Sequence, residues 1–209
     1  MMKQHKMILE GMRMKCFLFG GRKWMDSCSE AYSRFLSGDK DAMTEIIIEY
    51  RDGLLLFLKG IVGDIYIAED IMEQTFMLLA IKKPKDKGGS SFKTWLYTIA
   101  RNLAIDYLRK KRRSNEVDIE AIGEMWNDEN LLEEKYIKKE EQILIRRAMN
   151  NLRNEYRQVL WLCYFEEMSN KEISKVMKKS IRSVEAMLYR AKKALREELV
   201  KEGINGVND

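Results

Sequence analysis

Apolar residues recur at helical spacing along most of this chain, and short polar or glycine-containing breaks separate the runs. Apolar positions at i, i+3, i+4 and i+7 are typical of a helix with one buried face. In the first half of the chain the pattern predicts helices from Ser29 to the break at 37–39, over Ala42–Val62, over Asp64–Ile81 and over Phe92–Arg113. Gly63 is the expected C-cap of the second helix, and a loop is expected at 84–91.

The pattern weakens over 114–130, and helices are expected again from Leu131. A break at 152–154 precedes a predicted helix over Glu155–Phe165. Ser169 and Glu172 then have the spacing of a capping box, in which a serine at the N-cap and a glutamate three residues later each bond to the other's backbone N–H group. A new helix is therefore predicted to begin at this point.

The segment after Ser169 predicts a helix-turn-helix. Lys178-Lys179 forms the expected turn between two helices, and Ser180 is the expected N-cap of the second. The apolar positions are Ile173, Val176 and Met177 in the first helix and Val184, Leu188, Ala191 and Leu195 in the second. A generic helical hairpin is the alternative interpretation.

The second helix of such a motif enters the major groove of DNA with the side chains near its N-terminus. The side chains on the outward side of this helix are Arg182, Ser183, Glu185, Ala186, Tyr189 and Arg190. Farther along, Lys192, Lys193 and Arg196 are expected to hold phosphate.

The run Phe92–Arg113 combines a predicted core face with aromatic and basic side chains. Trp95, Leu96, Ile99, Leu103 and Leu108 are its expected core positions. Basic charge is densest at its C-terminal end, and Trp95, Tyr97 and Tyr107 add aromatic rings that could stack on unpaired bases. The alternative is an ordinary core helix with a solvated basic end.

Composition supports an all-α protein and narrows its function. The 209 residues include a single proline, and 45% are hydrophobic, which is enough for the core of two small domains. Three widely spaced cysteines, no CxxC and one histidine argue against a zinc site or a disulfide framework and fit a reducing cytoplasm. We expect no cofactor, no metal and no small-molecule substrate. Short apolar runs predict no membrane insertion, and no signal peptide is recognisable.

Charge alternates in blocks along the chain. Residues 93–113 have seven basic and one acidic side chains, residues 114–141 have three basic and ten acidic, and residues 169–201 have ten basic and four acidic. Two basic blocks around an acidic one suggest two nucleic-acid-binding units joined by an acidic connector. The predicted organisation is an N-terminal extension (1–25), a helical domain (26–113), an acidic linker (114–139), a second helical domain (140–200) and a C-terminal tail (201–209). The extension contains five methionines before Met25 and is expected to be a disordered arm or an over-extended translation start.

Three segments together resemble one family. Asp64–Ala80 (DIYIAEDIMEQTFMLLA), Phe92–Arg113 (FKTWLYTIARNLAIDYLRKKRR) and Leu152–Leu195 are similar to the polymerase-binding helix, the promoter-opening helix and the C-terminal domain of bacterial RNA polymerase sigma factors of the extracytoplasmic-function (ECF) group. The resemblance implies a protein that binds RNA polymerase core and directs promoter-specific initiation. Its first domain would open the minus-ten element, and its second would read the minus-thirty-five element as duplex.

The resemblance also implies roles for individual residues. The polymerase-binding candidates are Asp70, Glu73, Gln74 and Phe76. The candidates for the minus-ten element are Trp95, Arg101, Asn102, Asp106, Arg109, Lys110, Arg112 and Arg113, with the loop at 82–91 beside them as part of a base-capturing pocket. Core polymerase and promoter DNA are the implied partners. Many members are held inactive by a membrane-bound anti-sigma protein, which is a further candidate partner.

The recognition helix departs from the family pattern. Glu185, Ala186 and Met187 stand where relatives often have basic, small and basic residues, so the preferred upstream sequence is left open. Two other classes compete with the sigma-factor interpretation. A conventional helix-turn-helix regulator would leave the 64–113 pattern unexplained, and a metal-dependent nuclease would need Asp64, Glu69, Asp70 and Glu73. A single histidine and no second acidic cluster lead us to expect no enzyme.

Overall fold

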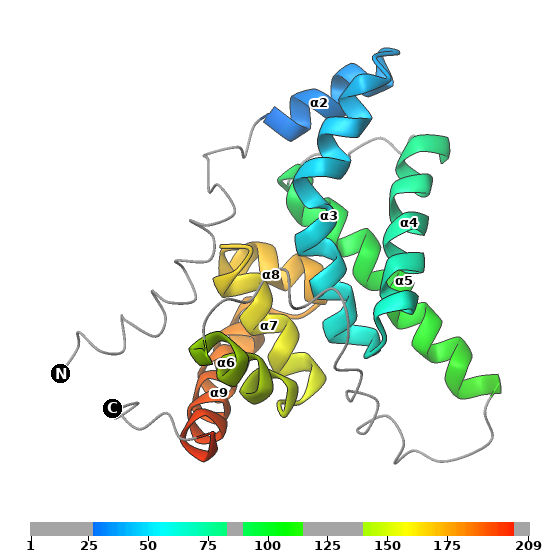
Figure 1. Cartoon of the computed structure of the whole chain (residues 1–209). Coiled ribbons are helices and arrows are strands. Elements are labelled where there is room, and N and C mark those ends of the chain that lie inside the picture. The colour runs from blue at the N-terminus through cyan, green and yellow to red at the C-terminus, as the bar shows by residue number, and fades with distance from the viewer. Residues whose placement is uncertain (1–26, 83–89, 115–139, 203–209) are drawn as a thin grey trace.

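The computed structural model describes residues 27–82, 90–114 and 140–202, and all regular elements in these ranges are helices. The N-terminal domain consists of α2 (Ser27–Leu36), α3 (Asp41–Val62), α4 (Ile65–Lys82) and α5 (Phe92–Ser114). The C-terminal domain consists of α6 (Glu140–Asn150), α7 (Asn154–Tyr164), α8 (Asn170–Met177) and α9 (Ile181–Lys201) (Figure 1). The all-α fold class is confirmed. The predicted N-terminal extension, residues 115–139 of the predicted linker and the last seven residues lie outside the described ranges.

Capping explains where α3 ends and α4 begins. Gly63 has a left-handed conformation (φ 85°), and its N–H donates to the carbonyl oxygen of Lys59 at 2.9 Å. Glycine adopts this conformation at little cost, so the predicted C-cap is confirmed. Asp64 Oδ1 accepts hydrogen bonds from the N–H groups of Tyr66 (2.8 Å) and Ile67 (3.0 Å), which otherwise lack intrahelical partners.

The predicted capping box is present at the start of α8. Ser169 Oγ accepts from the Glu172 N–H at 3.3 Å, and Glu172 Oε2 accepts from the Ser169 N–H at 3.0 Å. Lys178 ends α8 in a left-handed conformation (φ 54°), and Ser180 Oγ caps α9 by accepting from the Ser183 N–H at 3.2 Å. The short helix, turn and long helix of the prediction are therefore all confirmed.

Each domain packs around one central helix. α3 contacts α2, α4 and α5, whereas α9 contacts α6, α7 and α8. The two domains also touch directly, because α5 packs on α8 and α3 packs on α7 (Figure 1). Buried apolar side chains form one cluster that continues across this contact, from Leu54 and Leu96 on one side to Leu160 and Ile173 on the other. Within the described ranges, no helix has the length and apolarity required to cross a bilayer.

Candidate polymerase and nucleic-acid interface

One face of α4 is exposed and combines polar with apolar side chains. Asp70, Glu73 and Gln74 lie on it, as the sequence predicts from their spacing. Three apolar residues at the same helical angle are also exposed: Tyr66 (67%), Met77 (55%) and Ile81 (73%). Sequence reasoning missed these three, although their spacing along the helix could have indicated them. Phe76 lies on the opposite face and is only 7% exposed, so its ring supports α4 from the core.

A groove of about 600 Å³ runs between α4 and the C-terminal half of α5. Asp70 and Gln74 line it on the α4 side, and Asp106, Tyr107 and Lys110 line it on the α5 side. The structure thus brings predicted polymerase-binding and promoter-binding residues to the two walls of one groove.

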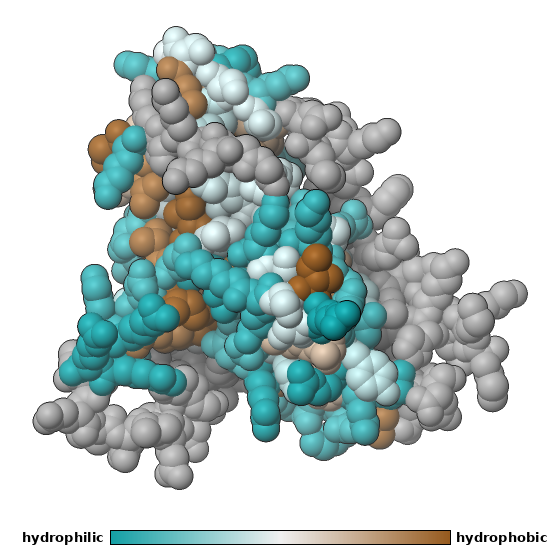
Figure 2. Space-filling model, turned by 180° about the vertical axis from the view of Figure 1, so that it is seen from behind, coloured by the Kyte–Doolittle hydropathy of each residue, from teal (hydrophilic) through white to brown (hydrophobic). Residues whose placement is uncertain are grey.

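The C-terminal half of α5 presents basic charge to solvent. Arg109, Lys110, Arg112 and Arg113 are exposed, and Lys111 is half-buried. Asp106 is also exposed and accepts a hydrogen bond from Arg109 Nη1 at 3.4 Å, while Asn102, one turn earlier, is half-buried. Seen from behind, hydrophilic side chains gather at the lower left, where this end of α5 lies (Figure 2).

The N-terminal half of α5 faces inward. Trp95 is half-buried among aromatic rings, with ring centroids 5.3 Å from Tyr32 and 5.6 Å from Phe92. Tyr97 is completely buried, with its ring centroid 5.2 Å from that of Phe57. The expectation that Tyr97 offers a ring for base stacking is therefore wrong, because its side chain is part of the core.

Arg101 is also turned inward. It is 9% exposed, and its Nε donates to Gln158 Oε1 on α7 at 2.7 Å. Burial lowers the pKa of the Arg101 guanidinium below its ordinary value, while the charge of Glu155 raises it in part. Arg101 therefore lies in the contact between the two domains and is separate from the exposed basic side chains at the C-terminal end of α5.

The outward face of α9 is accessible. Arg182, Glu185, Ala186, Tyr189, Arg190, Lys192 and Lys193 are exposed, and Ser183 is half-buried. The predicted stripe of Val184, Leu188, Ala191 and Leu195 is buried. Met187 is 4% exposed, so only Glu185 and Ala186 of the unusual triplet lie on the outward face. Lys192 lies 5.5 Å from the centroid of the Tyr164 ring, and Arg196 is half-buried.

The polar residues between the domains are the largest group that sequence reasoning missed. Lys93 Nζ lies 2.7 Å from Glu166 Oε2, and Asn154 Nδ2 donates to the carbonyl oxygen of Ile61 at 2.6 Å. Glu172 accepts from Ser91 and Thr94 in addition to its role in the capping box. Burial acts to raise the pKa of Glu172, but hydrogen bonds from Ser169, Ser91 and Thr94 outweigh it and hold the pKa below the ordinary value.

One acidic residue of the nuclease alternative has a structural role. Asp64 caps α4. Within the ranges that the structure describes, no group of three or more histidine, cysteine, aspartate or glutamate residues is arranged to hold a metal ion.

Both domains match known families. Residues 46–114 match the family described as Sigma-70 region 2, and residues 142–195 match Sigma-70, region 4. The first match covers α4 and α5, the helices that the interpretation as a conventional helix-turn-helix regulator does not explain.

Curated relatives and solved structures agree with these matches. The chain is 30% identical over 170 residues to the ECF RNA polymerase sigma factor SigW of Bacillus subtilis, covering 78% of this chain and 91% of SigW. It is also 30% identical over 161 residues to SigM of the same organism, covering 77% of this chain and 96% of SigM. The sigma factor RpoE from Bartonella quintana, solved with the anti-sigma factor NepR, shares the fold with a TM-score of 0.62 at 23% identity, over 78% of this chain and 98% of that chain.

Two family matches in the expected order, together with relatives aligned over nearly their whole length, identify the protein. The chain belongs to the ECF group of RNA polymerase sigma factors, the initiation factors that bind core polymerase and direct promoter-specific transcription.

Proposed function

We propose a division of labour within this sigma factor. The N-terminal domain (26–113) binds core polymerase with α4 and opens the minus-ten element with α5, and the C-terminal domain (140–200) reads the minus-thirty-five element with α9. The observation that carries the proposal is the exposed outward face of α9, whose opposite face is buried along its whole length. Such a helix, held by caps at its start, can enter a major groove without disturbing its own domain.

The face of α4 suits a protein partner more than a nucleic acid. Asp70 and Glu73 are acidic and would repel phosphate, whereas Tyr66, Met77 and Ile81 are large apolar side chains exposed to solvent. Exposed aromatic residues and methionine are enriched where proteins bind proteins. We therefore assign polymerase binding to this face and add the three apolar residues to the predicted Asp70, Glu73 and Gln74.

The C-terminal half of α5 suits DNA. Arg109, Lys110, Arg112 and Arg113 offer positive charge for phosphates. Asn102 and Asp106 lie four residues apart on the same side of the helix and can hydrogen-bond to bases that leave the stack. Flipped bases must be captured as they unstack, because each unstacked step costs a few kcal/mol.

The setting and the partners follow from this function. Core polymerase and promoter DNA are the partners, and the cytoplasm, where both are found, is the proposed location. Solved relatives with the same fold include RpoE with NepR and CnrH with the cytosolic domain of CnrY. We extend this mode of control to the present chain and propose an anti-sigma protein as a third partner.

Transcription from a matching promoter tests the assignments. Met77→Lys should reduce binding to core polymerase, because it places a charge in an apolar contact. Arg190→Ala should leave core binding intact and reduce initiation from promoters that depend on the upstream element. Lys40→Ala, at the start of α3, is a matched surface control for both. Normal core binding by a Met77→Lys/Ile81→Lys double variant would refute the α4 assignment, and normal initiation by Arg190→Ala would refute the α9 assignment.

A further inference from the structure

Tyr189 lies in the first half of α9 and presents its ring to solvent. It is 74% exposed, more than any other large hydrophobic side chain in the described part of the C-terminal domain. Within the described ranges, no hydrogen bond, ion pair or ring contact involves it. Single exposed hydrophobic residues are common on protein surfaces. The position of this ring on the outward face of α9 is what points to a ligand.

The surroundings of Tyr189 form a small apolar area within a basic face. Ala186 is exposed on the same side of the helix, three residues earlier. Helical side chains lean toward the N-terminus of their helix, so the ring of Tyr189 is directed over the turn that contains Ala186. Arg182, Arg190 and Lys193 are exposed around the pair. Arg190 Nε donates to the carbonyl oxygen of Ala186 at 3.2 Å, which holds this guanidinium beside the helix.

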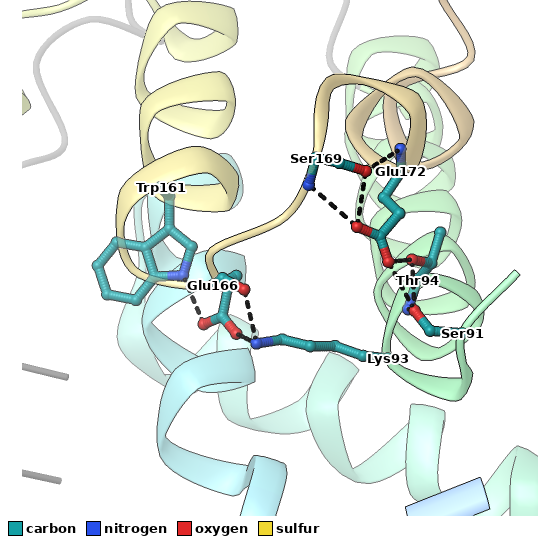
Figure 3. A network of polar contacts seen from close by, with 7 residues as sticks. All are labelled: Ser91, Lys93, Thr94, Trp161, Glu166, Ser169 and Glu172. Atoms are coloured by element: carbon teal, nitrogen blue, oxygen red, sulfur yellow. Dashed lines mark hydrogen bonds and ion pairs between the residues drawn. The ribbon is translucent and has the colours of Figure 1, made fainter. Parts of the chain in front are cut away.

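This face of α9 is free in the observed arrangement of the two domains. The other helix of the helix-turn-helix, α8, is held on α5, where Glu172 accepts from Ser91 Oγ at 2.9 Å and from Thr94 Oγ1 at 3.1 Å (Figure 3). α9 packs on α6, α7 and α8 through its opposite, buried face. Ala186 and Tyr189 can therefore meet a duplex without any change within their own domain.

An apolar side chain in the major groove has one apolar group to recognise. Every base pair presents hydrogen-bonding groups there, and only thymine adds a C5-methyl group. We propose that Ala186 and the ring of Tyr189 select a thymine in the minus-thirty-five element by contact with its methyl group. The inference rests on the proposed function, in which α9 reads this element as duplex.

The same two residues disfavour the other bases. A donor or acceptor that faces an apolar surface loses its water without gaining a partner, which costs binding free energy. Glu185, next to Ala186, is the polar counterpart, because a carboxylate can accept from cytosine N4. The reading face thus combines a polar and an apolar determinant, and we expect the preferred element to contain both a cytosine and a thymine.

The test uses holoenzyme and the sequence recovered by selection from a randomised upstream element. Each thymine of that sequence is replaced in turn by uracil, which removes only the methyl group. Wild-type holoenzyme should bind one of the substituted duplexes about fourfold more weakly, the value expected for one buried methyl-sized group. At the same position, 5-methylcytosine should be bound more tightly than cytosine, because it restores the methyl group without the other groups of thymine.

Variants of Tyr189 assign the effect to its ring. Tyr189→Ala should bring the affinities for the thymine and uracil duplexes close together, and the fold should remain intact because the side chain is exposed. Tyr189→Phe should keep the difference, since it loses only the hydroxyl group. Val200→Ala is the matched control. It truncates a 49% exposed apolar side chain about three turns later on the same helix and should leave the difference unchanged.

The outcomes separate this inference from the proposed function. A preferred upstream sequence without thymine, or uracil duplexes bound as tightly as thymine duplexes, would refute the inference alone. A methyl effect that persists in full in Tyr189→Ala, or that disappears in Tyr189→Phe, would refute its assignment to the ring. Holoenzyme that prefers no upstream sequence at all would refute the proposed role of α9 itself.

Discussion

Two helices of this sigma factor, α5 and α9, are predicted to bind DNA, and they differ in how much of their length is exposed. α5 has 23 residues and α9 has 21, and both have basic side chains along their length. On α9 the outward face is free from Arg182 to Lys193. On α5 the exposed side chains all lie after Arg101, because the first half packs on α3, α8 and the aromatic cluster around Phe92.

Arg101 on α5 and Arg190 on α9 illustrate the consequence of this difference in exposure. Arg101 is 9% exposed and bonded to Gln158 in the other domain, whereas Arg190 is exposed and bonded through Nε to the carbonyl oxygen of Ala186 in its own helix. Basic charge on a helix therefore does not by itself identify a DNA contact. The elements that pack on the helix decide which arginines are available, and for α5 that includes the second domain.

The largest effect that distinguishes the two halves of α5 is on stability. Leu96 is completely buried in the first half, so Leu96→Ala should lower the free energy of unfolding by about 2–5 kcal/mol. Leu108→Ala is the matched control, since Leu108 is on the same helix but is half-buried, and it should cost clearly less. Urea denaturation followed by circular dichroism measures both. Equal losses would mean that the two halves are equally part of the core.

On α9 the largest effect should be a change of base preference. Glu185 is exposed on the outward face, where a carboxylate can accept a hydrogen bond from cytosine N4. Glu185→Lys should change the preferred base at one upstream position by about 1–3 kcal/mol. Selection from a randomised upstream element, with wild-type and variant holoenzyme, measures it. Identical preferences at every position would remove Glu185 from the reading face.

The fold was largely predictable because its signals are local. Gly63 at a helix end, the Ser169–Glu172 capping box and the Ser180 cap each act within a few residues, and each lies where the pattern predicts. Helical spacing likewise identified the buried stripe of α9. The family resemblance rests on the same segments, and the family matches confirm it.

The buried positions of Arg101 and Tyr97 were not predictable in the same way. Their environment is made by residues distant in the chain, such as Gln158, 57 positions after Arg101. No periodicity within α5 contains that information. One local signal did point to a close approach, namely Gly53 inside an otherwise strong helical pattern, but it does not indicate that the approaching group is Glu166.

Substitutions in the C-terminal half of α5 should affect promoter opening more than binding to core polymerase. Asn102→Ala and Asp106→Ala remove polar groups that are proposed to hold flipped bases, and the loss of one such contact should slow open-complex formation by about tenfold. Permanganate reactivity of unpaired thymines measures opening, and co-purification measures core binding, which should be unchanged. Normal opening by both variants would exclude them from the pocket. Lys40→Ala is again the matched surface control.

The smallest effect compares how the two helices hold phosphate. Each phosphate contact contributes about 0.9 to the salt slope of binding for duplex DNA and about 0.7 for a single strand. Lys193→Ala and Arg112→Ala each remove one exposed positive charge, from α9 and from the end of α5. Neither should change the free energy of unfolding by more than about 0.5 kcal/mol, because both side chains are on the surface.

The choice of DNA separates the two contacts. If α9 holds duplex, Lys193→Ala holoenzyme should lose about 0.9 of salt slope on a probe that contains the upstream duplex, and should match the wild type on a forked probe without it. If α5 holds the opened strand, Arg112→Ala should lose about 0.7 on both probes, because both contain the minus-ten single strand. Affinity is measured between low and moderate salt for the wild type and both variants, on both probes, and gives the six slopes to be compared. A Lys193→Ala loss that persists on the forked probe would show that α9 contacts DNA outside the upstream element, and the contrast between the two helices would then be one of burial alone.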